Sequence, residues 1–227
     1  MKPADRLIVA FDTSLPAEAL RLARALRGLV RTVKVGSVLF TAAGPDILLR
    51  LRRLGFRMML DLKFHDIPNT VELSCRAAAA HGVSLLTVHA SGGSAMLAAA
   101  VRGAQAGAGR RARPLVLGVT VLTSVGGRSA RGRVMALAKE AFTAGCDGVV
   151  ASAQEAAALH QRFGRRLKIV CPGIRQASAE RGDQRRVATP AQALAAGADW
   201  LVVGRPITGS RNPRQAAQEI LTEMEDP

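Results

Sequence analysis

The sequence predicts an α/β protein, a single-domain (β/α)8 TIM barrel over residues 1–227, and three observations lead to that fold class. Eight apolar runs of strand length recur along the chain, and a segment with helical spacing of apolar residues follows each run. Glycines precede several of the runs, where helices end and short loops lead into the next strand. Alternating strands and helices predict a parallel sheet, and a chain of 227 residues suits one closed barrel.

The predicted strands are short, continuous and rich in leucine or β-branched residues, as parallel strands covered on both faces are. In chain order they are Leu7–Phe11, Thr32–Gly36, Arg57–Leu62, Leu85–His89, Leu115–Thr120, Gly148–Ala151, Lys168–Cys171 and Trp200–Val203. The first segment between strands shows the helical pattern, because Leu20, Ala23 and Leu26 fall on one face.

An open, doubly wound sheet is the alternative topology, but no Gly-x-Gly-x-x-Gly segment follows the first strand as a dinucleotide fold would favour. Two segments rich in glycine and arginine, Gly103–Arg113 and Ser124–Arg133, are expected to be surface loops.

The charge pattern argues against a nucleic-acid partner. The chain has 32 basic and 17 acidic residues, a formal charge of +15, and basic surfaces gain affinity for phosphate backbones. The arginines are spread along the whole chain, however, and aromatic residues make up only 3%, which leaves few groups to stack on bases. We expect a solvated basic surface, with an RNA- or DNA-binding module as the alternative from another functional class.

Composition also indicates the compartment. No run approaches the roughly 20 apolar residues that span a bilayer, and the first strand starts too early to leave room for a signal peptide. The three cysteines, Cys75, Cys146 and Cys171, are widely spaced and form no Cys-x-x-Cys pair, so neither disulfides nor a zinc site is expected. We therefore expect a cytoplasmic protein with no membrane partner.

Charged residues gather where the predicted strands end, which is where barrels of this kind carry their chemistry. Asp12 follows the first strand, Lys34 lies in the second, and Asp61 and Lys63 close the third, with Asp66 just beyond. Residues two apart on a strand share a face, so Asp61 and Lys63 are expected to be neighbours that Lys34 joins. Such an array is costly to desolvate and indicates a catalytic site, although an ordinary buried ion pair is the alternative for Asp61 and Lys63 alone.

A phosphate site is expected on the other side of the barrel mouth. Gly204 and Arg205 follow the eighth strand, and Arg175 follows the seventh. A backbone amide and guanidinium groups suit a phosphate, which these barrels often hold after strands seven and eight.

Residues 58–70, Met-Met-Leu-Asp-Leu-Lys-Phe-His-Asp-Ile-Pro-Asn-Thr, resemble the D-x-K-x-x-D-[I/V]-x-x-T motif of the orotidine 5′-phosphate decarboxylase family. The resemblance extends over nearly the whole chain, through Ala10–Asp12, Lys34–Gly36, Thr87–Ala90, Val121–Ser124, Pro172–Arg175, Gly182–Arg186 and Gly204–Thr208.

The resemblance implies conversion of orotidine 5′-monophosphate (OMP) to uridine 5′-monophosphate (UMP) and CO2, the last step of de novo UMP synthesis, with no metal or cofactor. It implies that Lys63 donates a proton to C6 and that Asp61 lies against the substrate carboxylate. It also implies a homodimer in which Asp66, Ile67 and Thr70 enter the partner's site.

The resemblance further implies which residues bind the rest of the substrate. Asp12 and Lys34 would hold ribose hydroxyls, and Thr123 would lie beside the base. The phosphate would be held by Arg175, Gln184, Gly204 and Arg205. A metal-dependent sugar-phosphate lyase or epimerase on the same barrel is the main rival, but its relatives tend to carry a glutamate where Lys34 stands.

Overall fold

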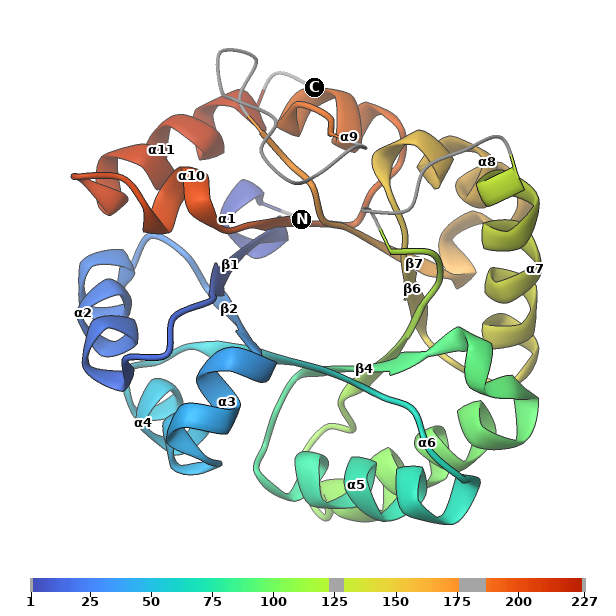
Figure 1. Cartoon of the computed structure of the whole chain (residues 1–227). Helices are drawn as coiled ribbons and strands as arrows, with labels where there is room; N and C mark the ends of the chain where they lie inside the picture. The colour runs from blue at the N-terminus through green and yellow to red at the C-terminus, as the bar shows by residue number, and fades with distance from the viewer. Residues whose placement is uncertain (1, 123–128, 176–186, 226–227) are drawn as a thin grey trace.

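The computed structural model, which describes residues 2–122, 129–175 and 187–225, is a closed parallel barrel, as predicted (Figure 1). The strands pair in chain order, and the last returns to pair with the first. They are β1 (Leu7–Phe11), β2 (Thr32–Gly36), β3 (Arg57–Phe64), β4 (Leu85–His89), β5 (Leu115–Val119), β6 (Gly148–Val150), β7 (Lys168–Cys171) and β8 (Trp200–Val203).

The helices form an outer ring around the barrel, except for the short first helix, which lies within that ring in this view (Figure 1). In chain order they are α1 (Pro3–Arg6), α2 (Pro16–Leu26), α3 (Ser37–Ala43), α4 (Asp46–Arg53), α5 (Pro68–Ala80), α6 (Gly93–Ala108), α7 (Ser129–Thr143), α8 (Ala153–Phe163), α9 (Pro190–Ala195), α10 (Arg205–Thr208) and α11 (Pro213–Glu223), with short 3-10 turns at Ala90–Gly92 and Gly164–Arg166. No helix in the described part of the chain is long and apolar enough to cross a membrane.

Strand alternation divides the core into two regions and decides where the charged residues point. Along β1, Leu7, Val9 and Phe11 pack outward against the helices, whereas Ile8 and Ala10 belong to a cluster inside the barrel. The cluster inside the barrel, called the inner layer below, consists of Ile8, Ala10, Met59, Leu85, Leu117, Val170 and Val202.

The same alternation continues on the next two strands. Val33 and Val35 pack outward, and so do Met58 and Leu60. Lys34 is therefore on the inner side of β2, and Asp61, two residues beyond the inward Met59, enters the barrel mouth from β3.

Three strand boundaries differ from prediction. β3 is two residues longer than expected, ending at Phe64, while β5 and β6 each end one residue earlier, at Val119 and Val150. The extension of β3 brings Lys63 into the strand, which already contained Asp61.

The expected loop Gly103–Arg113 is wrong over its first half, because α6 continues to Ala108. Its glycines serve helix packing: a Cβ at Gly103 would overlap the backbone of Glu72 on α5, and one at Gly107 would overlap that of Arg76. The segment Ser124–Arg133 is helical from Ser129 onward, so that expectation is also wrong there, and residues 124–128 lie outside the described residues.

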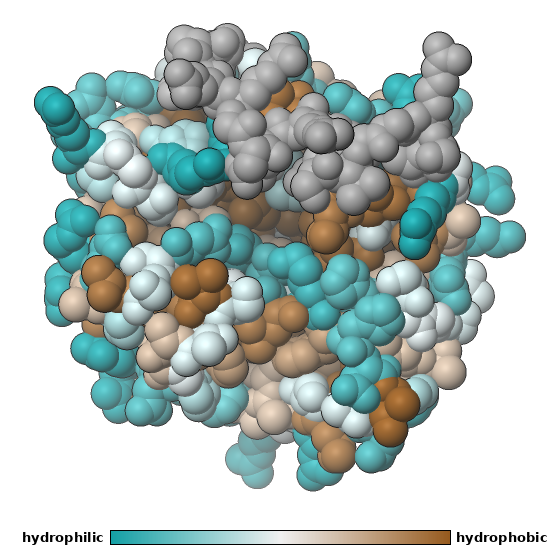
Figure 2. Space-filling view, in the orientation of Figure 1, coloured by the Kyte–Doolittle hydropathy of each residue, from teal (hydrophilic) through white to brown (hydrophobic). Residues whose placement is uncertain are grey.

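Large apolar side chains are exposed where strands lead into helices. Four of these follow β1, β2, β3 and β5 and are 61, 50, 65 and 44% exposed: Leu15, Val38, Ile67 and Leu122. In the end-on space-filling view, hydrophilic residues gather across the middle and apolar patches interrupt the surface beside them (Figure 2).

Candidate active site

A cavity of about 390 Å³ lies at the end of the barrel where the strands finish. Seven of the residues predicted from the sequence line it together: Asp12, Lys34, Asp61, Lys63, Arg175, Gly204 and Arg205. Apolar residues of the barrel interior, among them Met59 and Val202, form its floor. The cavity therefore has a charged side at β1–β3 and a cationic corner at β7–β8.

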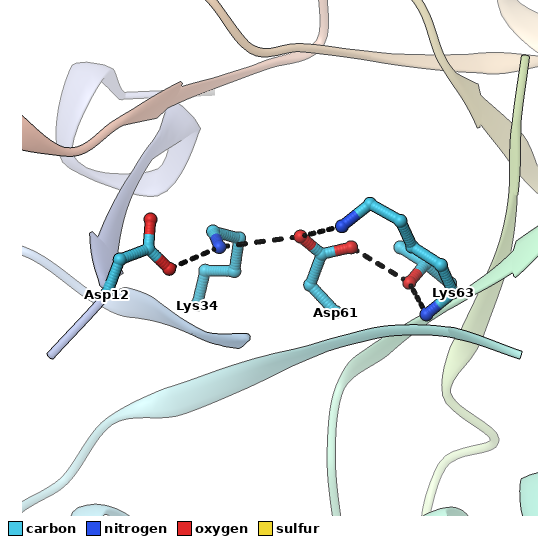
Figure 3. A network of polar contacts seen from close by, with 5 residues as sticks. Asp12, Lys34, Asp61 and Lys63 are labelled. Atoms are coloured by element: carbon cyan, nitrogen blue, oxygen red, sulfur yellow. Dashed lines mark hydrogen bonds and ion pairs between the residues drawn. The ribbon is translucent and has the colours of Figure 1, made fainter. Parts of the chain in front are cut away.

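Four charged side chains form an alternating row on the first side (Figure 3). Lys34 Nζ lies 2.8 Å from Asp12 Oδ1 and 3.4 Å from Asp61 Oδ2, and Lys63 Nζ lies 2.9 Å from the same Asp61 oxygen. The side chains of Lys34 and Asp61 are about one-tenth exposed, whereas those of Lys63 and Asp12 are 35 and 55% exposed. The row thus has a buried centre and two ends that a substrate can reach.

The neighbouring positions of Asp61 and Lys63 come from an irregular strand rather than from simple alternation. Leu60 pairs with Leu86 and Phe64 with Val88, so three residues of β3 stand opposite the single Thr87 of β4. Lys63 at the bulge has a φ of 52°, the one positive φ among the described non-glycine residues.

Thr87 holds this irregular segment in place. Its hydroxyl donates a hydrogen bond to Asp61 Oδ1 at 2.9 Å and accepts one from the backbone N–H of Lys63 at 3.0 Å. The side chain is completely buried. Sequence reasoning gave Thr87 no role, since a threonine within an apolar strand resembles any other β-branched core residue.

The charge of Asp61 is stabilised by its surroundings. Burial disfavours the carboxylate, but the ammonium groups of Lys34 and Lys63 and hydrogen bonds from Lys63 and Thr87 outweigh burial, so the pKa of Asp61 lies below its usual value. Asp61 is therefore ionised at neutral pH while it lies in contact with a catalytic candidate.

The cationic corner joins the ends of β7 and β8. Arg175 is only 9% exposed; its guanidinium donates to the carbonyl of Ile174 at 3.1 Å, and its backbone N–H donates to that of Ala188. Gly204 and Arg205 lie at the start of α10 across the same corner. Arg175 is therefore largely buried in the cavity wall, beside the other two residues of the expected phosphate site.

Other predicted residues lie elsewhere. Asp66, Ile67 and Thr70 are exposed after β3 and do not line the cavity of their own chain. Asp66 Oδ1 accepts a hydrogen bond from the N–H of Ile67 at 2.7 Å. Thr123 and Gln184 lie outside the described residues.

His89 ends β4 close to the charged row, with its ring centroid 5.4 Å from that of His65. Partial burial and the positive charges of His65 and Lys63 lower the pKa of His89, against the opposing effect of Asp61. In the described part of the chain, no group of three or more His, Cys, Asp or Glu residues is arranged to hold a metal ion.

Comparison with known proteins agrees with this geometry. A model of the orotidine 5′-phosphate decarboxylase / HUMPS family matches residues 5–220. The orotidine 5′-phosphate decarboxylase of Vibrio cholerae serotype O1 (strain ATCC 39541) is 47% identical over 224 residues, covering 95% of this chain and 96% of that protein. The enzyme of the same name from Halorhodospira halophila is 49% identical over 228 residues, covering 96 and 95%.

Solved structures show the same likeness. The crystal structure of orotidine 5′-phosphate decarboxylase from Lactobacillus acidophilus matches with a TM-score of 0.85 at 36% identity, over 97% of this chain and 99% of that one. A conserved protein from Geobacillus kaustophilus matches with a TM-score of 0.84 at 35% identity, over 96 and 99%.

Proposed function

The chain belongs to the orotidine 5′-phosphate decarboxylase / HUMPS family, and from this membership we propose that it is the carboxy-lyase that converts OMP to UMP and CO2. The observation that carries the proposal is the alternating row of Asp12, Lys34, Asp61 and Lys63 in one cavity. Loss of CO2 from C6 leaves an electron pair in an orbital with little delocalisation. The protein must therefore supply a positive charge beside C6 and a proton for it.

Lys63 suits both tasks. Its ammonium ends the row at the open side of the cavity, within reach of a bound substrate, and it would stabilise the electron pair as the C6–CO2 bond breaks. The ammonium would then transfer one proton to C6, which completes UMP and leaves a neutral amine that solvent reprotonates. Because the row itself provides the charge and the proton, the reaction needs no cofactor.

Asp61 would act on the bound substrate by repulsion. Its carboxylate stays ionised between Lys34 and Lys63, so it would repel a substrate carboxylate placed beside it and raise the free energy of the bound substrate. That repulsion would end when the carboxylate leaves as neutral CO2. Binding far from C6 would offset this cost.

The cationic corner supplies that remote binding. Arg175 and Arg205 carry guanidinium groups suited to a phosphate, and Gly204 adds a backbone amide beside them. The exposed carboxylate of Asp12 and the Nζ of Lys34 are suited to hold ribose hydroxyls between the phosphate corner and the reacting carbon. We also assign Thr123 to the base and Gln184 to the phosphate, on the family resemblance alone.

We propose further that the active unit is a homodimer in which Asp66, Ile67 and Thr70 enter the partner's site. These residues do not line the cavity of their own chain, and Ile67 is 65% exposed. Exposed apolar side chains at two other strand ends, Leu15 and Val38, would be covered by the same contact. We also assign the protein to the cytoplasm, where reducing conditions would keep the three buried cysteines free. Because the proposed product is UMP itself, the reaction would be the last step of UMP synthesis.

A direct assay tests the activity. Purified protein treated with chelator should remove the ultraviolet absorbance of OMP, and Lys63→Ala should lower kcat by several orders of magnitude while the protein stays folded. Turnover of Lys63→Ala within tenfold of the parent would contradict the role of Lys63 as the proton donor.

Subunit mixing tests the shared site. Inactive Lys63→Ala and inactive Asp66→Asn proteins should regain activity when mixed, because a hybrid dimer contains one intact site. No recovery, with subunit exchange verified by a tagged chain, would show that Asp66 acts within its own chain.

The metal-dependent sugar-phosphate lyase is disfavoured by the position of Lys34. Its ammonium lies within 3.4 Å of both carboxylates that could bind a divalent cation, and it would repel one. Activity on OMP that survives EDTA would agree with this reasoning, whereas activity restored only by Mg²⁺ would contradict it.

A further inference from the structure

A second cavity, of about 690 Å³, lies at the opposite end of the barrel, where the strands begin. It is lined by residues that precede or start β1, β2, β3, β4, β5 and β8. Four arginines line it: Arg31, Arg57, Arg111 and Arg113. They come from three segments of the chain, because Arg111 and Arg113 share the connection between α6 and β5.

The positive charge of this cavity is only partly compensated. Arg31 Nε lies 3.0 Å from Asp5, and Arg113 forms a two-pronged contact with Asp147 at 2.7 and 2.8 Å. Arg57 and Arg111 have no carboxylate partner within the described residues. Arg111 is nevertheless held in place, because its guanidinium donates to the carbonyl of Ala80 at 2.9 Å.

Apolar residues form the inner wall of the cavity. Leu85 belongs to the inner layer, and Leu115 and Trp200 pack against it. The indole N–H of Trp200 donates to the carbonyl of Asp5 at 3.1 Å, which fixes the orientation of the ring. An aromatic and aliphatic wall beside guanidinium groups suits a ligand with a flat, weakly polar part and an anionic part.

We propose that this cavity, called the basal cavity, binds a free nucleoside phosphate, with the base against Trp200 and the phosphates between Arg57 and Arg111. The volume is sufficient for one small molecule. The inner layer separates the basal cavity from the one at the strand ends, and the two share no lining residue. The inference is therefore independent of the proposed decarboxylase activity.

The chain provides its own reporter, because Trp200 is the one tryptophan and there is no tyrosine. ATP would be titrated against intrinsic fluorescence excited at the red edge of the tryptophan band, with free N-acetyltryptophanamide correcting for absorption by the nucleotide. We expect a saturable change with a Kd of about 1 mM or lower. Arg57→Gln and Arg111→Gln should each raise that Kd by about tenfold or more.

The matched control is Arg162→Gln, which removes one charge from an exposed position on α8. It should leave the Kd unchanged, and all three variants should keep the parent's thermal unfolding temperature and decarboxylase activity. An unsaturable signal, or equal weakening by Arg162→Gln, would overturn the proposal because either would indicate general charge attraction.

Two further ligands define the chemistry. Tripolyphosphate should bind more weakly than ATP, and equal affinity would refute a role for the base. An RNA decamer that bound at least tenfold more tightly than ATP through Arg57 and Arg111 would assign the cavity to nucleic acid and would equally overturn the proposal.

Discussion

Replacing Thr87 with valine tests the part of the site that the sequence did not reveal. Valine has nearly the same shape as threonine and suits a buried strand, so the packing is retained while the hydroxyl is lost. The variant removes the hydrogen bond to Asp61 Oδ1 and leaves the backbone N–H of Lys63 without its partner.

The magnitude follows from those two contacts. A hydrogen bond to a charged group contributes about 1.5–3 kcal/mol, and a donor left unpaired in a partly buried place costs about 1–3 kcal/mol. Burial of the valine methyl group that replaces the hydroxyl offsets part of these two losses. We therefore expect Thr87→Val to lower the free energy of unfolding by about 3 kcal/mol. Small displacements of Asp61 and Lys63 should lower kcat/KM by about 100-fold.

Urea denaturation and steady-state kinetics on OMP measure the two effects, and Thr87→Ser, which keeps the hydroxyl, is the control. Serine should retain most of the activity while losing some stability through its missing methyl group. The reasoning would be refuted if Thr87→Val changed the free energy of unfolding by less than about 0.5 kcal/mol, as substitutions at inconsequential positions do, and kcat/KM by less than twofold. The hydroxyl would then have no supporting role.

Three other predictions address charge, packing and thiol reactivity. The pKa of Asp61 is depressed in the folded protein, so ionised Asp61 contributes to the free energy of unfolding above its unfolded pKa of about 3.9. This contribution is lost as the pH falls through the lower folded pKa. Urea denaturation measured from pH 6 to 2.5 should show the loss in the parent and not in Asp61→Asn. Gly103→Ala should destabilise the fold by about 1–3 kcal/mol, because the added Cβ would overlap the backbone of α5. Gly132→Ala, in open space on α7, should stabilise the fold by about 0.5–1 kcal/mol. Thermal unfolding temperatures measure both effects, and a higher temperature for Gly103→Ala or a lower one for Gly132→Ala would contradict the reasoning. Burial raises the pKa of each of three thiols to about 12: Cys75, Cys146 and Cys171. A chromogenic disulfide reagent at pH 8 should therefore react with them only after the protein unfolds. Rapid labelling of the native protein would contradict their buried positions.

Much of the barrel could be predicted because its signals are local. Continuous apolar runs located all eight strands, because strands covered on both faces need apolar residues on both sides. The rule that functional residues gather at the strand ends of such barrels is enough to predict that Asp12, Lys34, Asp61 and Lys63 share one cavity.

What could not be predicted depends on contacts between distant segments. Glycines inside α6 looked like loop residues, since the closeness of α5 is visible only once the helices pack. The bulge in β3 depends on Thr87, one strand away, and no local pattern marks it. Whether Asp66 serves a partner is a property of two chains and stays a prediction.

The left-handed backbone of Lys63 has a consequence for protein engineering. A lysine in this conformation costs roughly 1 kcal/mol that glycine would not, so the local geometry favours a residue that cannot donate a proton. A screen that rewarded heat resistance alone would score Lys63→Gly by the backbone strain that it relieves and the ion pair with Asp61 that it loses, and would not register the loss of the proposed proton donor. Stabilising this barrel for practical use therefore requires that turnover be scored in every round.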